Sequence, residues 1–275
     1  MTRRVLLVLL PAVLLVACQR QAPAPAGAAA PATSATAAVA PAAPASVAGL
    51  QDVVEANPRY VIGISYPKEA AGHPGLAAAL KRYADASRQD LLDAVEGLGN
   101  DKPTAPYELS LSYTTLANTP KLIAVAADGS LYTGGAHGSP LIARFVWLPE
   151  RNARLTAQAL VPEATGWQAI SDFVREQLHT ALSQRIDADD VPAEERADML
   201  REATRMIDDG TQPTADAFSE FEPRLGADGR IVSLRFVFPP YQVGPYADGT
   251  QTVDVPAEVL LPHVAPAYRA LFHGG

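Results

Sequence analysis

The segment of residues 19–48 limits where this chain can fold. Nearly every residue in it is alanine or proline, with a few serines and threonines. Such a segment has no large apolar side chains to bury, so it cannot recover the conformational entropy that folding costs. Repeated Ala-Pro pairs favour the extended polyproline II conformation. We therefore predict a disordered tether over residues 19–48 and a folded part that begins near residue 49.

The segment before the tether has the features of a bacterial export signal. Arg3 and Arg4 precede an apolar run over residues 5–16, which is too short for a membrane-spanning helix. Residues 15–18 read Leu-Val-Ala-Cys, which resembles a lipobox, and Cys18 is the single cysteine. In such signals the cysteine thiol receives a diacylglyceryl group. Cleavage before this cysteine then makes it the new N-terminal residue. We predict a signal peptide over residues 1–18 that ends at a lipidated Cys18, with an ordinary secretory signal as the alternative.

The expected location follows from this reading. Gln19 stands where an aspartate would resemble the inner-membrane retention signal of some bacteria. We therefore expect a cell-envelope lipoprotein that is held through its N-terminal lipid on the periplasmic face of the outer membrane. The inner membrane stays the alternative location. Loss of Arg3 and Arg4 with the signal changes the net charge from −8 to −10. Because an acidic chain repels phosphates, no nucleic-acid partner is expected.

Two kinds of hydrophobic periodicity begin the folded part. Apolar residues occupy every second position over residues 60–66 and 107–114, a pattern typical of strands with one solvated face. Residues 75–97 instead repeat apolar side chains at helical spacing. These patterns predict a strand, a helix and a second strand in this order.

Further strands are expected after residue 120. Residues 121–126, 131–132 and 140–148 have strand character, and Asp128-Gly129 is interpreted as a hairpin turn between the first two of them. Strands separated by short turns after a helix favour an α+β fold over alternating βαβ units.

The second half predicts two helices followed by a small sheet. Residues 167–182 have the spacing of an amphipathic helix, and Pro192 begins another. The expected buried stripe of that second helix consists of Met199, Ala203, Met206 and Ile207.

The remaining residues predict antiparallel strands. Asp228-Gly229 is expected to join residues 221–225 to residues 231–238 as a hairpin, before a strand over residues 251–255 and a short helix around residues 256–268. The fold class is therefore α+β, with antiparallel sheets and packed helices. We assign one α+β domain to residues 49–160 and a second to residues 161–275.

A search for chemical motifs assigns no catalytic residue. The five histidines include no pair spaced three to five residues apart, as local zinc sites require. No nucleophile elbow, phosphate-binding loop or dinucleotide fingerprint is present. We expect no cofactor and no metal. The acidic clusters (Asp187, Asp189, Asp190; Asp208, Asp209) are interpreted as helix-end residues, although carboxylates brought together by folding stay an alternative.

Two segments stand out as candidate sites. Residues 132–138 read Tyr-Thr-Gly-Gly-Ala-His-Gly, and three glycines in five residues indicate positive φ or a close backbone approach. The candidate residues here are Tyr132, Gly134, Gly135, His137 and Gly138. Two interpretations stay open for His137: it fixes the turn by binding backbone groups, or it contacts a ligand.

The second segment covers residues 236–249. Its prolines and glycines predict an extended turn, in which Tyr241, Pro245 and Tyr246 are the candidate residues. Packing of a sharp corner is one interpretation. A recognition surface is the other, because tyrosine is favoured at interfaces.

Both segments carry a family resemblance over about residues 59–271. The loop Tyr-Thr-Gly-Gly-Ala-His-Gly resembles the non-catalytic domain attached to the peptidoglycan deacetylase PdaC. The later motif Phe-x-Phe-x-x-Tyr-x-x-x-Pro-Tyr-Ala-x-Gly is similar to the C-terminal ectodomain of RsiV, an anti-sigma factor that senses lysozyme. The resemblance implies an α+β fold and binding of a muramidase or of cell-wall material. The chain departs from both families, since it has neither a deacetylase domain with its zinc motif nor a sigma-binding segment.

Three functions follow for testing. The first is a lipid-anchored envelope binding module whose partner is a lysozyme-like muramidase or a peptidoglycan fragment. The second is an envelope hydrolase that acts on peptidoglycan through carboxylates brought together by folding. The third is a structural lipoprotein without a soluble ligand. Because no catalytic motif is found, binding is favoured over catalysis.

Overall fold

The computed structural model describes residues 50–188 and 192–275. The predicted signal peptide, Cys18 and the tether lie outside these residues, so they stay predictions. Among the helices of the described part, none is both long and apolar enough to cross a membrane.

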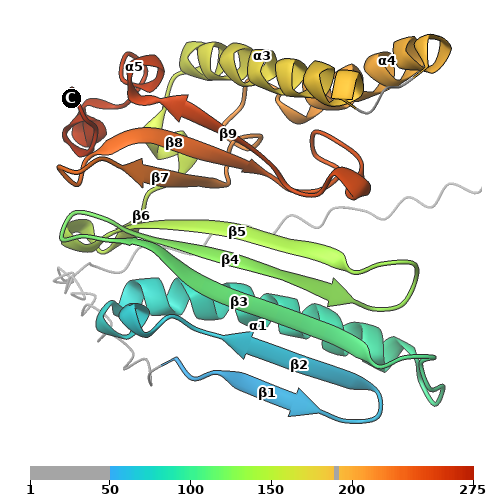
Figure 1. Cartoon of the computed structure of the whole chain (residues 1–275). Helices are drawn as coiled ribbons and strands as arrows, with labels where there is room; N and C mark the ends of the chain where they lie inside the picture. Colours follow the sequence, from blue (N-terminus) through green and yellow to red (C-terminus); the bar gives the residue numbers. More distant parts are fainter. Residues whose placement is uncertain (1–49, 189–191) are drawn as a thin grey trace, which may run out of the picture. The chain divides into compact units, whose positions relative to one another are not determined.

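A six-stranded sheet forms the first half of the described chain. Its strands follow chain order, and all neighbours are antiparallel except β2 and β3, which are parallel. The long helix α1 (Pro74–Gly97) connects that parallel pair (Figure 1). The strands are β1 (Val53–Ala56), β2 (Tyr60–Ser65), β3 (Tyr107–Asn118), β4 (Ile123–Tyr132), β5 (Ser139–Leu148) and β6 (Ala153–Arg154).

The first core lies between α1 and one face of this sheet. Along β3, Leu109, Leu111 and Tyr113 are buried while the residues between them are exposed, as the alternation predicts. On α1 the fully buried Leu76, Leu80 and Leu91 face these residues in one cluster. Burial of such aliphatic side chains contributes about 1.5–3 kcal/mol each.

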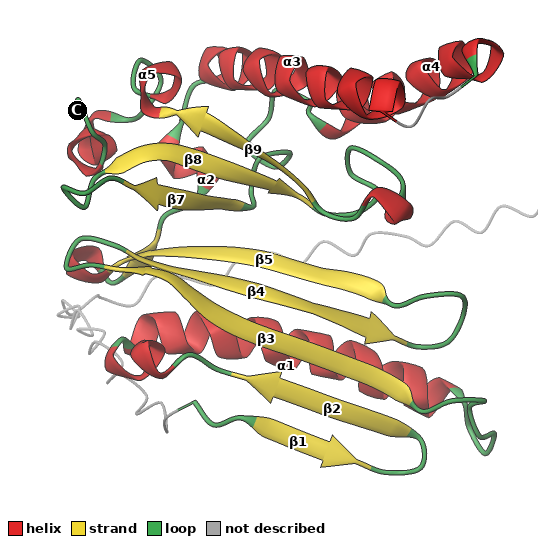
Figure 2. Cartoon of the chain, in the orientation of Figure 1, coloured by secondary structure: helices red, strands yellow, loops and turns green. Residues whose placement is uncertain are grey.

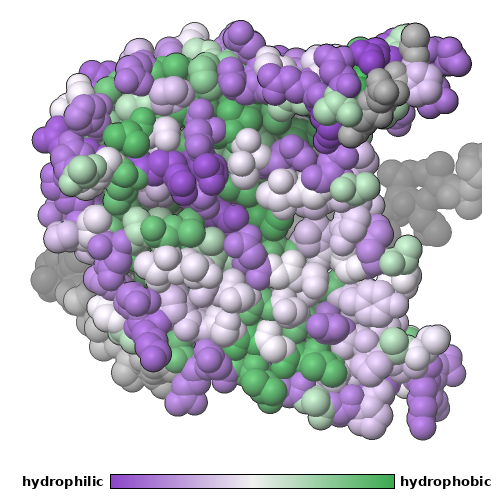
Figure 3. Space-filling model, in the orientation of Figure 1, coloured by the Kyte–Doolittle hydropathy of each residue, from purple (hydrophilic) through white to green (hydrophobic). Residues whose placement is uncertain are grey.

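A three-stranded antiparallel sheet and two long helices form the second half (Figures 1 and 2). Hydrophilic residues dominate the outer surface over α3 and α4 on the face shown in Figure 3. The elements are α2 (Ala157–Leu160), α3 (Ala164–Ala188), α4 (Ala193–Gly210), β7 (Phe221–Leu225), β8 (Ile231–Phe238), β9 (Gln251–Pro256) and α5 (Ala257–Leu260), with short 3₁₀ helices η3 (Tyr246–Asp248) and η4 (Pro266–Leu271).

The second core joins α3 to the small sheet. Trp167 stacks on Phe218 with ring centroids 5.6 Å apart, and Phe218 meets Phe236 edge-on at 5.1 Å. Val146 and Leu148 of β5 also belong to this cluster. The α+β fold class is therefore confirmed, while the exact domain limits at residues 160 and 161 stay predictions.

One predicted turn is wrong. Asp128 and Gly129 do not end a hairpin but lie inside the continuous strand β4, where Gly129 pairs with Leu111 on one side and Leu141 on the other. A Cβ atom at Gly129 would lie 2.0 Å from the carbonyl oxygen of Ser110. This glycine is thus required by close strand approach and not by a turn.

The expected stripe on α4 is also only partly buried. Ile207 is buried, but the Met199 side chain is 46% exposed. Met199 and Met206 instead line an open cavity between α3, α4 and the turn at Pro245. The helical spacing is correct, yet no element of the described chain covers this end of the stripe.

Candidate functional site

The glycine-rich loop connects β4 to β5. Gly134 and Gly135 have φ values of 98° and 94°, which only glycine adopts without strain. The hydroxyl of Tyr132 donates to the carbonyl of Gly135 at 3.3 Å and closes the turn. Gly138 has no positive φ; a Cβ there would contact Ser130 at 3.4 Å. The loop therefore depends on glycine at two positions. It places His137 beyond the end of β4 and before the start of β5.

The second predicted segment follows β8. Tyr241 has a φ of 74°, and its N–H donates to the carbonyl of Gly244 at 2.9 Å. A left-handed backbone at a non-glycine residue costs about 1–3 kcal/mol and persists where its surroundings enforce it. Pro245 precedes η3, and Asp248 in η3 binds Arg185 of α3 at 2.8 Å. This turn is thus fixed at both its ends.

The structure brings the two predicted segments together. The Tyr241 hydroxyl lies 3.0 Å from Nε2 of His137, across 104 residues of sequence. The rings of His137 and Tyr246 stack with centroids 3.9 Å apart and planes 15° apart. Both connections lie at the same end of their sheets in Figure 2. We call His137, Tyr241 and Tyr246 the aromatic cluster.

The hydrogen-bond partners of His137 select one tautomer of its neutral ring. Nδ1 of His137 lies 3.1 Å from the carbonyl oxygen of Gly138, which can only accept. In the neutral imidazole, Nδ1 therefore carries the hydrogen, and Nε2 accepts from the Tyr241 hydroxyl. Both ring nitrogens are thereby used within the protein.

The cluster remains open to solvent. Tyr241 is 56% exposed and Tyr246 is 37% exposed, although both rings already have partners. Rigid, exposed aromatic rings gain contact area with a partner at small entropic cost. The arrangement suits surface recognition; no catalytic role follows from it.

Replacing His137 by Ala should remove both contacts that the histidine makes to the tyrosines. An aromatic pair contributes about 0.5–1.5 kcal/mol, so we expect the melting temperature to fall by about 2–4 °C. Thermal unfolding followed by circular dichroism measures this shift. A loss of all cooperative unfolding would show that His137 is instead essential to the fold.

The sequence did not predict an ionic cluster between the two sheets. Arg144 of β5 is 8% exposed and donates to Glu222 of β7 at 3.0 Å and to Asp128 at 2.9 Å. Its backbone N–H donates to Glu220, whose pKa is raised mainly by burial. The available signal was a charged residue inside an otherwise apolar strand. Among the described residues, no group of three metal-ligating side chains is present.

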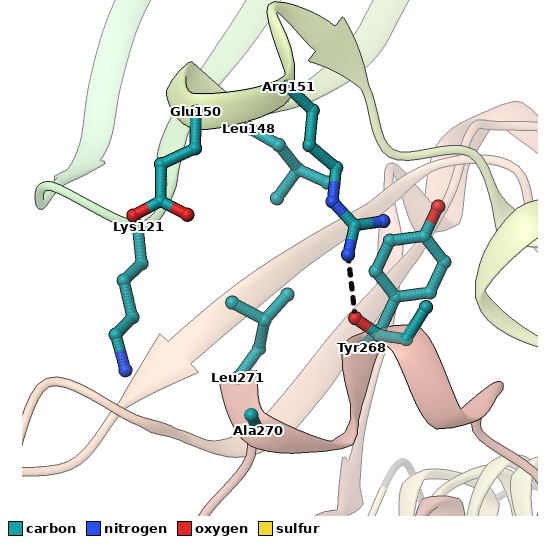
Figure 4. Close-up of a pocket in the computed structure, with 8 residues that line it drawn as sticks. Lys121, Leu148, Glu150, Arg151, Tyr268, Ala270 and Leu271 are labelled. Atoms are coloured by element: carbon teal, nitrogen blue, oxygen red, sulfur yellow. Dashed lines mark hydrogen bonds between the residues drawn. The ribbon is translucent and has the colours of Figure 1, made fainter.

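A cavity of about 280 Å³ lies at the C-terminal end of the chain (Figure 4). Arg151 donates to the carbonyl of Ala267 at 2.9 Å and stacks over the Tyr268 ring at 4.7 Å. Arg151 is thus already used in holding η4, and none of the predicted site residues lines this cavity.

Comparison with known proteins defines two regions. Residues 53–140 match the family model described as deacetylase PdaC, and residues 160–258 match that of a protein of unknown function, DUF3298. The chain therefore carries a PdaC-like region followed by a DUF3298 region, and each holds one half of the aromatic cluster. The search of curated proteins found no match. The similarity to RsiV stays a prediction.

A solved structure shares this fold. A DUF3298-family protein from Pseudomonas aeruginosa is 16% identical, with a TM-score of 0.54, over 82% of this chain and 96% of that chain. A member of the same family from Bacteroides fragilis is also 16% identical, with a TM-score of 0.48, over 79% and 93% of the two chains. At this identity, the first similarity shows the fold alone.

Proposed function

We propose that the protein is a lipid-anchored envelope module that binds a lysozyme-like muramidase through the aromatic cluster. The observation that carries the proposal is the meeting of His137 with Tyr241 and Tyr246 on an exposed surface. These are the segments on which the family resemblance rests. A peptidoglycan fragment is the competing ligand.

The surroundings of the cluster support contact with a protein partner. The turn that carries Tyr246 also lines a cavity of about 420 Å³ through Pro245 and Asp248. Met199 and Met206 line the same cavity, and methionine adapts its shape to a partner at low cost. Exposed tyrosines beside flexible apolar side chains are the usual composition of a contact site.

Charge supports a cationic partner. With the signal removed, the net charge would be −10. Opposite charges raise the association rate more than they slow dissociation. We therefore expect the association rate to fall as salt rises, since the Debye length shrinks from about 10 Å at 0.1 M to about 3 Å at 1 M.

Surface plasmon resonance tests this proposal. Lysozymes of several classes and purified muropeptides are passed over the immobilised full chain at these two salt concentrations. Saturable binding of a lysozyme with a salt-dependent association rate supports the proposal. Binding of muropeptides alone would transfer the function to cell-wall fragments, and no binding of either would contradict it.

The lipid anchor has its own expected result. The sequence of residues 15–18 predicts that labelled palmitate is incorporated into the wild-type chain and not into the Cys18→Ser variant. Equal labelling of both chains, or of neither, would contradict lipidation at Cys18.

A further inference from the structure

A further cavity lies between α1 and β5, and no residue of the aromatic cluster lines it. Its volume is about 470 Å³, within the usual range of small-ligand sites. Its lining residues come from four segments of the chain, namely α1, β5, β6 and the residue before β7.

Small residues on α1 create this space. Gly75, Ala79 and Ala86 lie on the side of α1 that faces the cavity, and none has a side chain long enough to fill it. A Cβ at Gly75 would lie 2.4 Å from the Trp147 ring. The glycine is therefore needed to seat the indole, which is one wall of the cavity.

The cavity has aromatic walls. Tyr83 meets Phe145 edge-on with ring centroids 6.0 Å apart. Trp147 is 6% exposed, and its indole N–H has no hydrogen-bond partner among the described residues. These rings favour a ligand with a flat apolar part.

The charged residues of the cavity differ in whether they already have partners within the protein. The Arg154 guanidinium lies 4.6 Å over the Phe145 ring and donates to the Arg144 carbonyl at 2.6 Å. Arg82 is exposed and has no ion pair or hydrogen bond within the described chain. Burial raises the pKa of Glu220, so its negative charge is disfavoured there. The unpaired cation of Arg82 is therefore available at the cavity. The single lining carboxylate, Glu220, offsets its positive charge only weakly.

A peptide strand does not suit this site. On the edge of β5 opposite β4, only Trp147 and Leu148 have a strand neighbour, which is β6. Glu220 already accepts from the Arg144 N–H, and Arg154 already donates to the Arg144 carbonyl. These side chains cap the strand edge and block β-strand addition.

We propose that the cavity binds a small organic anion that carries an aromatic or alicyclic ring beside a carboxylate. The ring packs against Phe145 and Trp147, and the carboxylate pairs with Arg82 and approaches Arg154. This site is independent of the muramidase proposal, because it shares no residue with the aromatic cluster.

Benzoate, benzamide and acetate are suitable probes of this site. Benzamide keeps the ring without the charge, and acetate keeps the charge without the ring. The chain has two tryptophans, so 5-fluorotryptophan labelling of the full chain gives two fluorine resonances. Trp147 lines the cavity, while Trp167 is buried in the second core. The Trp147→Phe variant assigns the two resonances.

Benzoate is expected to shift only the Trp147 resonance, with a dissociation constant of about 1 mM or tighter. Benzamide and acetate should bind about tenfold more weakly, because each lacks one of the two interactions.

Arg82→Gln should weaken benzoate binding about fivefold or more. Lys81→Gln is the control, because it removes the same charge from the adjacent exposed position. Glu220→Gln should strengthen binding, since the amide oxygen still accepts from Arg144 while the negative charge is lost.

Three results would overturn the proposal. The first is the absence of a saturable shift of the Trp147 resonance with benzoate. The second is equal binding of benzoate and benzamide. The third is an equal effect of Arg82→Gln and Lys81→Gln, which would show only a general response to surface charge.

Discussion

Replacing Gly129 by Ala should lower the free energy of unfolding by about 3 kcal/mol or more, beyond the usual cost of overpacking. The added Cβ would lie 2.0 Å from the Ser110 carbonyl oxygen and 2.9 Å from Cα of Leu111. Both are backbone atoms of β3, so the clash is relieved only by separating β3 from β4. These two strands pair along most of their length in the centre of the first sheet. Urea unfolding of the full chain measures the change.

Gly63→Ala is the matched control, because Gly63 also lies inside a strand. A Cβ there meets no atom within 4 Å, and Gly63 has no positive φ. The same substitution should be neutral or should stabilise the protein by about 0.4–1 kcal/mol, through the lower entropy of the unfolded chain. Equal destabilisation by the two variants would contradict the placement of Gly129 inside β4.

Replacing Arg144 by Met should lower the free energy of unfolding by about 3–5 kcal/mol, as expected when one partner of a buried ion pair is removed. Arg144 and Glu222 are 8% and 7% exposed, and Nε of Arg144 lies 3.0 Å from the Glu222 carboxylate. The methionine side chain would fill similar space but leave the buried Glu222 carboxylate with only its longer ion pair to the exposed Arg224, at 3.9 Å. The loss should appear as a lower urea midpoint.

The double variant Arg144→Met/Glu222→Gln should recover a large part of this loss, because the buried negative charge that lost its close partner is then removed as well. The pair of Arg235 and Asp254 is the control, since its side chains are 31% and 45% exposed. Breaking that pair by Arg235→Met should cost about 1 kcal/mol or less. If the double variant is no more stable than Arg144→Met alone, the buried charge is not the cause.

Local patterns in the sequence predicted the elements of this fold. The alternation of Leu109, Leu111 and Tyr113 with polar residues predicted β3 and its buried face, which the structure confirms. Asp228-Gly229 was correctly predicted as a hairpin turn, with a φ of 72° at Gly229. The same residue pair at Asp128-Gly129 lies within a strand. Asp-Gly tolerates both conformations, and the pairing of these two residues with β3 on one side and β5 on the other makes them part of a strand.

Contacts between distant segments could not be predicted in this way. The sequence identified His137 and Tyr246 separately, but nothing local indicated that their rings stack. The local patterns also do not predict the parallel pairing of β2 with β3, because the direction of β3 depends on how α1 crosses the sheet. Arg144 shares its face of β5 with the buried Val146 and Leu148, so its charge needs a buried partner, but the local pattern does not indicate which segment supplies it.

The dissociation rate of a bound lysozyme from Tyr246 variants tests the central claim most directly. Tyr246→Ala removes the ring that stacks on His137, whereas Tyr246→Phe keeps the ring and removes only the hydroxyl. Loss of an aromatic contact residue mainly speeds dissociation and leaves association nearly unchanged. We predict dissociation about tenfold faster or more for Tyr246→Ala, and within about threefold of wild type for Tyr246→Phe. Equal dissociation rates for wild type and Tyr246→Ala, with both chains folded, would contradict recognition through the aromatic cluster.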